Sequence, residues 1–263
     1  MPMNRGRRMN LREVVALVTG GASGLGEATV LALAGAGAKV MIVDADAAGG
    51  ERVAAQNTDS IMFAKADVAD ENDIAAAIKK TVDAFGKVNA VVNCAGVADA
   101  GKIKSKRGPL SLESFNKVIR VNLVGTLNVI RLAVGQISVN EPDDDGERGV
   151  IINTASIAAF DGQIGQAAYC ASKGGIVAMT LPVARECADY GIRVVTIAPG
   201  LFDTPLMSGM PPEVKQVMAG NVPFPRRLGK PEEFARMAMH IMENRMLNGC
   251  CIRLDGALRM PPK

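Results

Sequence analysis

Short apolar runs alternate with helix-like segments from one end of the chain to the other, and this alternation limits the possible folds more than any other feature. The runs are almost continuously apolar, as in strands covered on both faces. The alternation therefore favours a parallel sheet, in which each crossover needs a helix. The predicted strands are Val14–Thr19, Lys39–Val43, Ile61–Ala64, Val88–Asn93, Val150–Thr154, Arg193–Ala198 and Cys251–Leu254. The predicted helices are Gly24–Ala36, Asp70–Phe85, Leu112–Ile137, Tyr169–Tyr190 and Pro231–Glu243.

The pattern predicts one domain over residues 11–263, because no linker, repeat or low-complexity tract divides the chain. Residues 1–10 are basic, lack the apolar core of a secretory signal and are expected to form a flexible tail. Two loops interrupt the alternation: Ala98–Pro109 is strongly basic, and the acidic Asn140–Gly149 is typical of a solvated loop. We expect the Pro- and Met-containing residues 202–229 to form a lid over a substrate.

Composition disfavours several classes of protein. There are 30 basic against 27 acidic residues, 3% aromatic residues and no Trp, so we expect no nucleic-acid partner. No apolar run approaches the roughly 18 residues of a membrane helix, so we expect no membrane partner. The single histidine, His240, cannot build a multi-histidine zinc site, and we expect no metal. Five cysteines without CxxC spacing are typical of reduced thiols, which predicts a cytoplasmic location.

A glycine-rich turn joins the first predicted strand to the first predicted helix. Its sequence, TGGASGLG, spans Thr19–Gly26. Glycines let the backbone approach a pyrophosphate closely, and the free N–H groups at the helix start bind its negative charge. A tight turn without a ligand is the alternative. The strand before it, the helix after it and an acid at the end of the next strand favour a dinucleotide.

That acid is Asp44. A carboxylate at this position accepts hydrogen bonds from a ribose hydroxyl and repels the additional phosphate of NADP. No Lys or Arg precedes Gly24 in the turn. The alternative role for Asp44 is that of a helix N-cap. We expect the cofactor to be NAD rather than NADP.

Tyr169 and Lys173 stand four positions apart at the start of a predicted helix, and so lie on one face. Lowering the pKa of a phenol by about three units takes roughly 4 kcal/mol. A positive charge about 4 Å away supplies about that much at an effective dielectric near 20, and a positive nicotinamide ring adds to it. The pair can therefore serve as a general acid and base without histidine. An ordinary contact on a helix surface is the alternative.

Other polar residues stand where such a sheet binds its ligand. Ser156 follows a predicted strand and can hold a carbonyl or alcohol oxygen, unless it only caps the next turn. The small residues of Asn93–Gly96 end another strand, where a ribose can lie against the backbone. Asn122 interrupts an apolar helix and needs polar partners, which a water bridge next to Lys173 would supply.

Together these motifs resemble those of the short-chain dehydrogenase/reductase family over nearly the whole chain after residue 10. The TGxxxGxG turn, the NCAG segment, Ser156, the YxxxK pair and the Pro-Gly after the sixth strand occur in the family's order and spacing. The resemblance implies an α/β fold with a single Rossmann-type, doubly wound parallel sheet of about seven strands and helices on both faces. It also implies the strand order 3-2-1-4-5-6-7 and a homotetramer.

The resemblance also assigns roles to residues. Asp67 would accept the amine of adenine, and Val68 would pack on its ring. The implied catalytic residues are Ser156, Tyr169, Lys173 and Asn122. The residues expected to bind NAD are Gly20, Ser23, Gly24, Leu25, Gly26, Asp44, Asp67, Val68, Cys94, Ala95, Gly96, Tyr169, Lys173, Pro199, Gly200, Phe202 and Thr204.

The implied reaction is the reversible, NAD-dependent oxidation of a secondary alcohol. The expected substrate is a small molecule, an (S)-3-hydroxyacyl-CoA of fatty-acid or branched-chain acyl oxidation. A hydroxysteroid or other hydrophobic alcohol dehydrogenase is one alternative, and a non-catalytic nucleotide-binding scaffold is another. Exposed basic residues would attract the phosphates of coenzyme A, unless they form only a solvated loop. These residues are Lys102, Lys104, Lys106 and Arg107.

Overall fold

Seven parallel strands form the central sheet. The structure is a computed structural model and describes residues 9–106, 108–207 and 210–262. The strand order is β3-β2-β1-β4-β7-β8-β9, which confirms the predicted order, since β5 and β6 form a separate hairpin. The strands are β1 (Val15–Thr19), β2 (Lys39–Asp44), β3 (Ile61–Lys65), β4 (Ala90–Asn93), β7 (Gly149–Thr154), β8 (Ile192–Pro199) and β9 (Cys251–Leu254). The winding reverses between β1 and β4, and such a reversal opens a crevice at the carboxyl ends of the strands.

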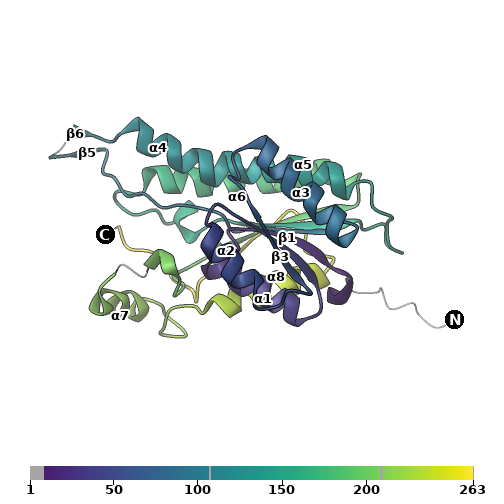
Figure 1. The fold of residues 1–263 in the computed structure, drawn as a ribbon. Coiled ribbons are helices and arrows are strands. Elements are labelled where there is room, and N and C mark those ends of the chain that lie inside the picture. Colours follow the sequence, from purple (N-terminus) through teal and green to yellow (C-terminus); the bar gives the residue numbers. More distant parts are fainter. Residues whose placement is uncertain (1–8, 107, 208–209, 263) are drawn as a thin grey trace.

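Helices cover both faces of the sheet, as predicted (Figure 1). One face carries α1 (Gly24–Gly35), α2 (Ala47–Ala54) and α8 (Pro231–Glu243). The other carries α3 (Glu71–Phe85), α4 (Leu112–Ile119), the π-helical turn η2 (Arg120–Val124), α5 (Gly125–Ile137) and α6 (Ala167–Ala188). The short helix α2 is the one element of these layers that periodicity did not predict.

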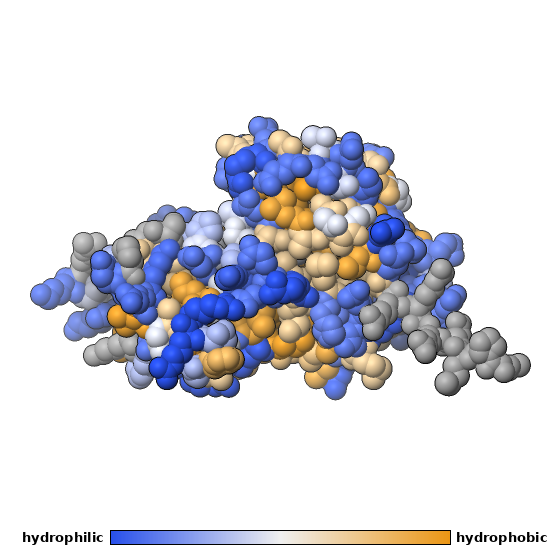
Figure 2. Space-filling view, turned by 90° about the horizontal axis from the view of Figure 1, so that it is seen from below, coloured by the Kyte–Doolittle hydropathy of each residue, from blue (hydrophilic) through white to orange (hydrophobic). Residues whose placement is uncertain are grey.

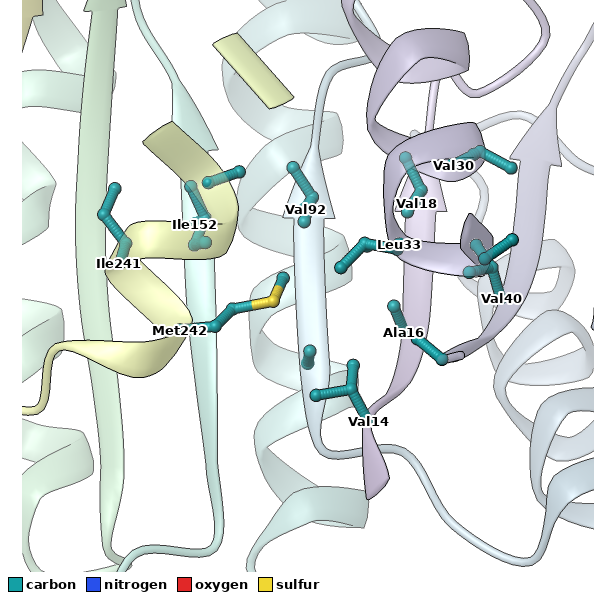
Figure 3. Packing of buried hydrophobic residues seen from close by; sticks show 14 of the residues in the cluster. Val14, Ala16, Val18, Val30, Leu33, Val40, Val92, Ile152, Ile241 and Met242 are labelled. Atoms are coloured by element: carbon teal, nitrogen blue, oxygen red, sulfur yellow. The ribbon is translucent and has the colours of Figure 1, made fainter. Parts of the chain in front are cut away.

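Side chains of each strand point alternately to the two faces and build two apolar cores. In β1, Ala16 and Val18 pack toward α1 and α8, whereas Leu17 packs toward α3 and α5. Figure 3 shows the first core, in which Val92 of β4 lies between Leu33 of α1 and Met242 of α8. Because both faces are buried, the strands read as continuous apolar runs in the sequence.

The continuous helical segment Leu112–Ile137 is long and apolar enough to cross a membrane by length and composition. It passes that test as core helices also do, since Val118, Val129, Ile130 and Ala133 are buried. Its place over the sheet accounts for its apolar character.

Two excursions and the C-terminus lie at the same end of the molecule (Figure 1). The basic loop forms a hairpin of β5 (Lys104–Ser105) and β6 (Gly108–Pro109), and the predicted lid contains α7 (Pro212–Gly220). Figure 2 shows apolar patches at the lid end, where Val214, Val217 and Phe224 are exposed. At the opposite end, Asn10 caps a short 3-10 helix (Leu11–Glu13), while residues 1–8 of the predicted tail lie outside the described residues.

The acidic loop Asn140–Gly149 is not simply solvated, which corrects our expectation. The Glu147 side chain is only 7% exposed and accepts a hydrogen bond from Arg193 at 2.8 Å, and Asp143 and Asp145 pair with Arg245. Burial raises the pKa of Glu147, against the lowering effect of Arg193. The Arg193 guanidinium also donates to backbone carbonyl groups at and after the end of α8, those of Ile241, Met242, Asn244 and Leu247. The loop is thus fastened to α8 through one buried cation.

We expect Arg193→Met to lower the free energy of unfolding by about 3–5 kcal/mol, because the inaccessible Glu147 carboxylate loses its hydrogen-bond donor and keeps only the more distant Arg245 at 3.4 Å. Urea unfolding followed by circular dichroism measures the loss. The control is Arg236→Met, since Arg236 is exposed on the same helix and should change stability by less than about 0.5 kcal/mol. Equal losses in the two variants would show that the buried contacts do not hold α8 and the loop together.

Candidate active site

One cavity of about 730 Å³ at the carboxyl ends of the strands contains nearly all the residues that the sequence singles out. The predicted residues that line it are Gly20, Ser23, Gly24, Leu25, Gly26, Asp44, Asp67, Val68, Cys94, Ala95, Gly96, Ser156, Tyr169, Lys173, Pro199, Gly200, Phe202 and Thr204. Among the predicted catalytic and NAD-binding residues, all of which the structure describes, only Asn122 does not line the cavity. The crevice expected at the reversal of the winding is therefore the site.

The glycine turn brings β1 against the loop that follows β4. Gly20 has φ +65°, and a Cβ atom on it would lie 2.6 Å from the Ala95 amide nitrogen. A Cβ atom on Gly26 would lie 2.1 Å from the Gly20 carbonyl oxygen, so α1 approaches the turn only because it carries glycine there. Ser23 is the N-cap of α1 and makes no side-chain hydrogen bond to the helix. The first N–H groups of α1 are thus left for an anion.

Asp44 ends β2 and is tied to this turn. Its Oδ2 atom accepts a hydrogen bond from the Ala22 N–H at 3.0 Å, and its Oδ1 atom accepts one from the Asp46 N–H at 3.0 Å. The N-cap of α2 is Asp46, whose side chain accepts from the Gly49 N–H. The alternative interpretation of Asp44 as a helix cap is therefore wrong.

Asp67 and Val68 follow β3, the neighbour of β2. The Asp67 carboxylate accepts hydrogen bonds from Arg120 at 2.7 Å and from the Ala69 N–H at 2.9 Å. Its side chain is 40% exposed, which leaves room for another donor. Val68 is buried and packs on Gly125, where a Cβ atom would lie 2.5 Å from its Cγ2 atom.

Tyr169 and Lys173 lie one turn apart near the start of α6, and both line the cavity. The buried Lys173 ammonium lies 5.8 Å from the centre of the Tyr169 ring and donates to the Thr154 carbonyl oxygen at 2.8 Å. Burial lowers the pKa of Lys173 to about 8. The ammonium form therefore still predominates at neutral pH. Since the pair faces a cavity, it is more than a contact on a helix surface.

The pKa of Tyr169 differs from our expectation. Burial raises it above the ordinary value, and the hydrogen bond with Ser156 lowers it by less. The protein groups by themselves thus do not produce an acidic phenol.

Ser156 combines the two roles that the sequence left open. It is the N-cap of a short 3-10 helix (Ile157–Ala159), and its Oγ atom accepts a hydrogen bond from the Ala158 N–H at 3.1 Å. It also lines the cavity beside Tyr169. Because the cap uses the oxygen as an acceptor, the hydroxyl proton is left for a phenol or substrate oxygen.

Asn122 lies behind the cavity, buried in η2. Its side chain accepts from the Val97 N–H at 2.8 Å and donates to the Val97 carbonyl oxygen at 2.9 Å and to the Ser172 hydroxyl at 3.0 Å. Both amide hydrogens therefore have protein partners, in contrast to the water-bridged arrangement next to Lys173 that we expected. Asn122 joins the loop after β4 to α6.

A row of buried polar side chains crosses the sheet beneath the cavity. Thr19, Asn93, Asn153 and Thr196 occupy matching register positions in β1, β4, β7 and β8. Asn93 donates to the Asn153 Oδ1 atom at 2.9 Å, and the Thr196 hydroxyl lies 2.6 Å from that of Thr180 in α6. Sequence reasoning missed this row, although each apolar run is broken by a polar residue at the corresponding place. The residues that follow the first three line the cavity: Gly20, Cys94 and Thr154.

Cys94 lines the cavity as a neutral thiol. Burial raises its pKa to about 11, and the Thr154 hydroxyl lies 3.5 Å from its sulfur. A Cβ atom on the nearby Gly96 would lie 3.3 Å from the Asn122 Oδ1 atom, which is a tight contact, and 3.6 Å from the Lys173 Nζ atom, which is an ordinary one. No group of three or more His, Cys, Asp or Glu side chains within the described residues is arranged to hold a metal.

The lid lines the other end of the cavity. Its two ends are joined, because Phe202 forms a β-bridge with Gly229. Thr204 lies over the glycine turn, because a Cβ atom on Gly24 would be 3.5 Å from the Cβ atom of Thr204. Three lid methionines, Met207, Met210 and Met218, line this end. Sequence reasoning missed further lining residues, among them Gln163, Gln166 and Met260, which no local pattern marks.

We expect Gly26→Ala to weaken dinucleotide binding by at least about tenfold, because the new methyl group must displace the Gly20 carbonyl. Titration of reduced dinucleotide followed by its fluorescence measures the effect. Gly35→Ala at the end of the same helix is the control, since no atom lies within 4 Å of the added Cβ. Wild-type affinity in Gly26→Ala would contradict the assignment of this turn to a dinucleotide.

Comparison with known proteins agrees with the geometry. The family model of the short chain dehydrogenases matches residues 14–215. The chain is 54% identical to "3-hydroxyacyl-CoA dehydrogenase type-2" of Bos taurus (96% of this chain, 98% of the other) and 52% identical to the protein of that name from Drosophila melanogaster (96% and 100%). A crystal structure of 3-hydroxyacyl-CoA dehydrogenase type-2 from Mycobacterium avium superimposes with a TM-score of 0.92 at 41% identity, covering 96% of this chain and 98% of that one. The chain belongs to the short-chain dehydrogenase/reductase family and is an oxidoreductase of the NAD(P)-dependent type.

Proposed function

We propose that the protein interconverts (S)-3-hydroxyacyl-CoA and 3-oxoacyl-CoA with NAD. The observation that carries the proposal is the convergence of Ser156, Tyr169 and Lys173 with the glycine turn in one cavity. Relatives that match over nearly their full length are named for 3-hydroxyacyl-CoA, which supports this substrate class. The presence of both Tyr169 and Lys173 in the cavity argues against a scaffold without activity.

The chain's own groups handle the substrate oxygen and its proton. Ser156 donates its hydroxyl proton to the substrate oxygen and holds it, and Tyr169 as phenolate takes the proton of the alcohol. Lys173 keeps a positive charge near the phenol. When bound, oxidised nicotinamide supplies the hydride acceptor and the positive charge that the raised pKa of Tyr169 requires.

The preference for NAD over NADP rests on Asp44. Its carboxylate lines the cavity beside the glycine turn, where it would repel a ribose phosphate. Arg52 of α2 does not line the cavity, and its guanidinium is held by Glu27 at 2.7 and 2.8 Å and by the Ala22 carbonyl oxygen at 2.9 Å. Asp67 and Val68 would hold the adenine. The Asp67 carboxylate would accept a hydrogen bond from the adenine amine, and the Val68 side chain would pack on the adenine ring.

The basic hairpin favours acyl-CoA over the alternative hydroxysteroid. Lys102, Lys104 and Lys106 are exposed on it, and Arg107 lies outside the described residues. At the base of the hairpin, the Gly101 N–H donates to the Gly165 carbonyl oxygen at 2.8 Å, next to the cavity-lining Gln166. The lysines thus stand near the substrate end, where they would attract phosphates that a steroid lacks. The homotetramer and the cytoplasmic location stay predictions.

We expect Tyr169→Phe to lower the turnover of 3-hydroxyacyl-CoA by at least about a hundredfold, because the proton acceptor is lost. Dinucleotide binding should change little. The rates are measured from the absorbance of reduced dinucleotide at 340 nm. NAD and NADP are compared as cofactors, and 3-hydroxyacyl-CoA and hydroxysteroids are compared as substrates. The other tyrosine supplies the control: Tyr190 is 51% exposed, and Tyr190→Phe should keep wild-type rates. Retained activity in Tyr169→Phe, or a wild type that prefers NADP or steroids, would contradict the proposal.

Replacing Lys102, Lys104 and Lys106 by Gln should raise the KM for 3-hydroxyacyl-CoA about tenfold, because the phosphates lose their attraction. The KM for the same acyl group on N-acetylcysteamine, which has no phosphate, should stay constant. The control variant neutralises Lys79 and Lys80 in α3 and Lys87 just after it. If KM rises equally for both thioesters, the lysines do not bind phosphate.

A further inference from the structure

The C-terminal segment, residues 255–262, contains none of the motifs, yet its Met260 lines the cavity. Its end is bonded to the loop after Ser156: the Pro262 carbonyl oxygen accepts from the Ile164 N–H at 3.0 Å, and the Pro261 carbonyl oxygen accepts from Gln163 at 3.0 Å. Gln163 itself lines the cavity. The segment thus has a defined course along the site.

A small apolar cluster joins this segment to the lid and to the loop after Ser156. Leu258 of the segment, Val222 of the lid and Ile157 are all buried in it. Met260 packs against the same cluster and is only partly buried. Since Ile157 directly follows Ser156, three parts of the chain that surround the substrate end share one separate core.

Arg253, at the end of β9, fixes the segment by charge. It donates to the carboxylates of Asp161 and Asp255 and to the Leu258 carbonyl oxygen, the last at 3.0 Å. Its guanidinium lies 5.1 Å from the centre of the Phe160 ring. The backbone of the segment is therefore held by hydrogen bonds at Leu258 and again at Pro261 and Pro262. The residue between them that lines the cavity thus has a fixed backbone position.

That residue is Met260, which lines the cavity together with the three lid methionines. An unbranched thioether fills irregular apolar space and adapts to varied ligands. The lid methionines sit on an excursion from the sheet, whereas Met260 is anchored from a different part of the fold. A chain extending from the reacting carbon toward this end would meet the lid on one side and Met260 on the other.

We propose that the C-terminal segment is the outer wall of the acyl-chain site and that Met260 determines which chain lengths are accepted. The inference rests on the proposed function and names what discriminates among its substrates. Truncating the Met260 side chain gives the acyl chain more room, and enlarging it gives the acyl chain less room. Neither change touches the groups that hold the proton or the dinucleotide.

The test compares kcat/KM for long-chain and short-chain 3-hydroxyacyl-CoA in two variants. In Met260→Ala the ratio of long to short should rise about tenfold, and in Met260→Phe it should fall about tenfold, through KM rather than kcat. Met260→Leu, in which the side chain keeps a similar volume, should have the same ratio as the wild type. The control is Met246→Ala, because Met246 is 91% exposed and does not line the cavity. A ratio that is the same in Met260→Ala, Met260→Phe and wild type overturns the inference, as does an equal change for every substrate.

The failure of the proposed function has a different signature. If the wild type oxidises hydroxysteroids but no 3-hydroxyacyl-CoA, the proposed function falls, and a small and a large hydrophobic alcohol then test Met260 by the same ratio. If the wild type oxidises 3-hydroxyacyl-CoA while both variants keep its ratio, only the role of Met260 falls. A wild type that oxidises neither class overturns both.

Discussion

The buried ammonium of Lys173 is the interaction on which the arrangement of the site depends. Moving a charge out of water is costly, and here the charge is held by the Thr154 carbonyl oxygen at 2.8 Å. That contact joins the start of α6 to the end of β7, so the helix that carries Tyr169 and the strand that leads to Ser156 meet at one point. With a pKa lowered by burial to about 8, the lysine still bears charge at neutral pH. The rest of the fold brings a dinucleotide turn to the same place.

Much of this could be predicted from the sequence, because the relevant signals are local. Continuous apolar runs mark strands buried on both faces, and parallel strands necessarily bring their carboxyl ends to one edge of the sheet. Residues just beyond those runs, such as Gly20, Asp44, Cys94 and Ser156, therefore converge whatever the loops do. The strand order itself followed from the family resemblance rather than from periodicity.

What the sequence could not give depends on contacts between distant segments. The partners of Asn122 follow from the packing of a π-helical turn against the loop after β4, which no spacing encodes. The buried ion pair of Arg193 and Glu147 could not be predicted, because Glu147 belongs to an acidic segment whose composition is that of an ordinary surface loop. Met260 enters the cavity only because the C-terminal segment folds back on the lid. The pKa of Tyr169 is set by burial, which the four-residue spacing does not report.

We propose that Tyr169 becomes an acid–base group only when the protein and a positively charged dinucleotide act together. The chain has two tyrosines, so in Tyr190→Phe a ¹³Cζ-tyrosine label reports Tyr169 alone. Its NMR titration should give a pKa above the ordinary value in the free protein and a value below it with oxidised NAD bound, whereas reduced NAD should lower it less. A phenol whose pKa is the same with and without oxidised NAD would contradict the mechanism.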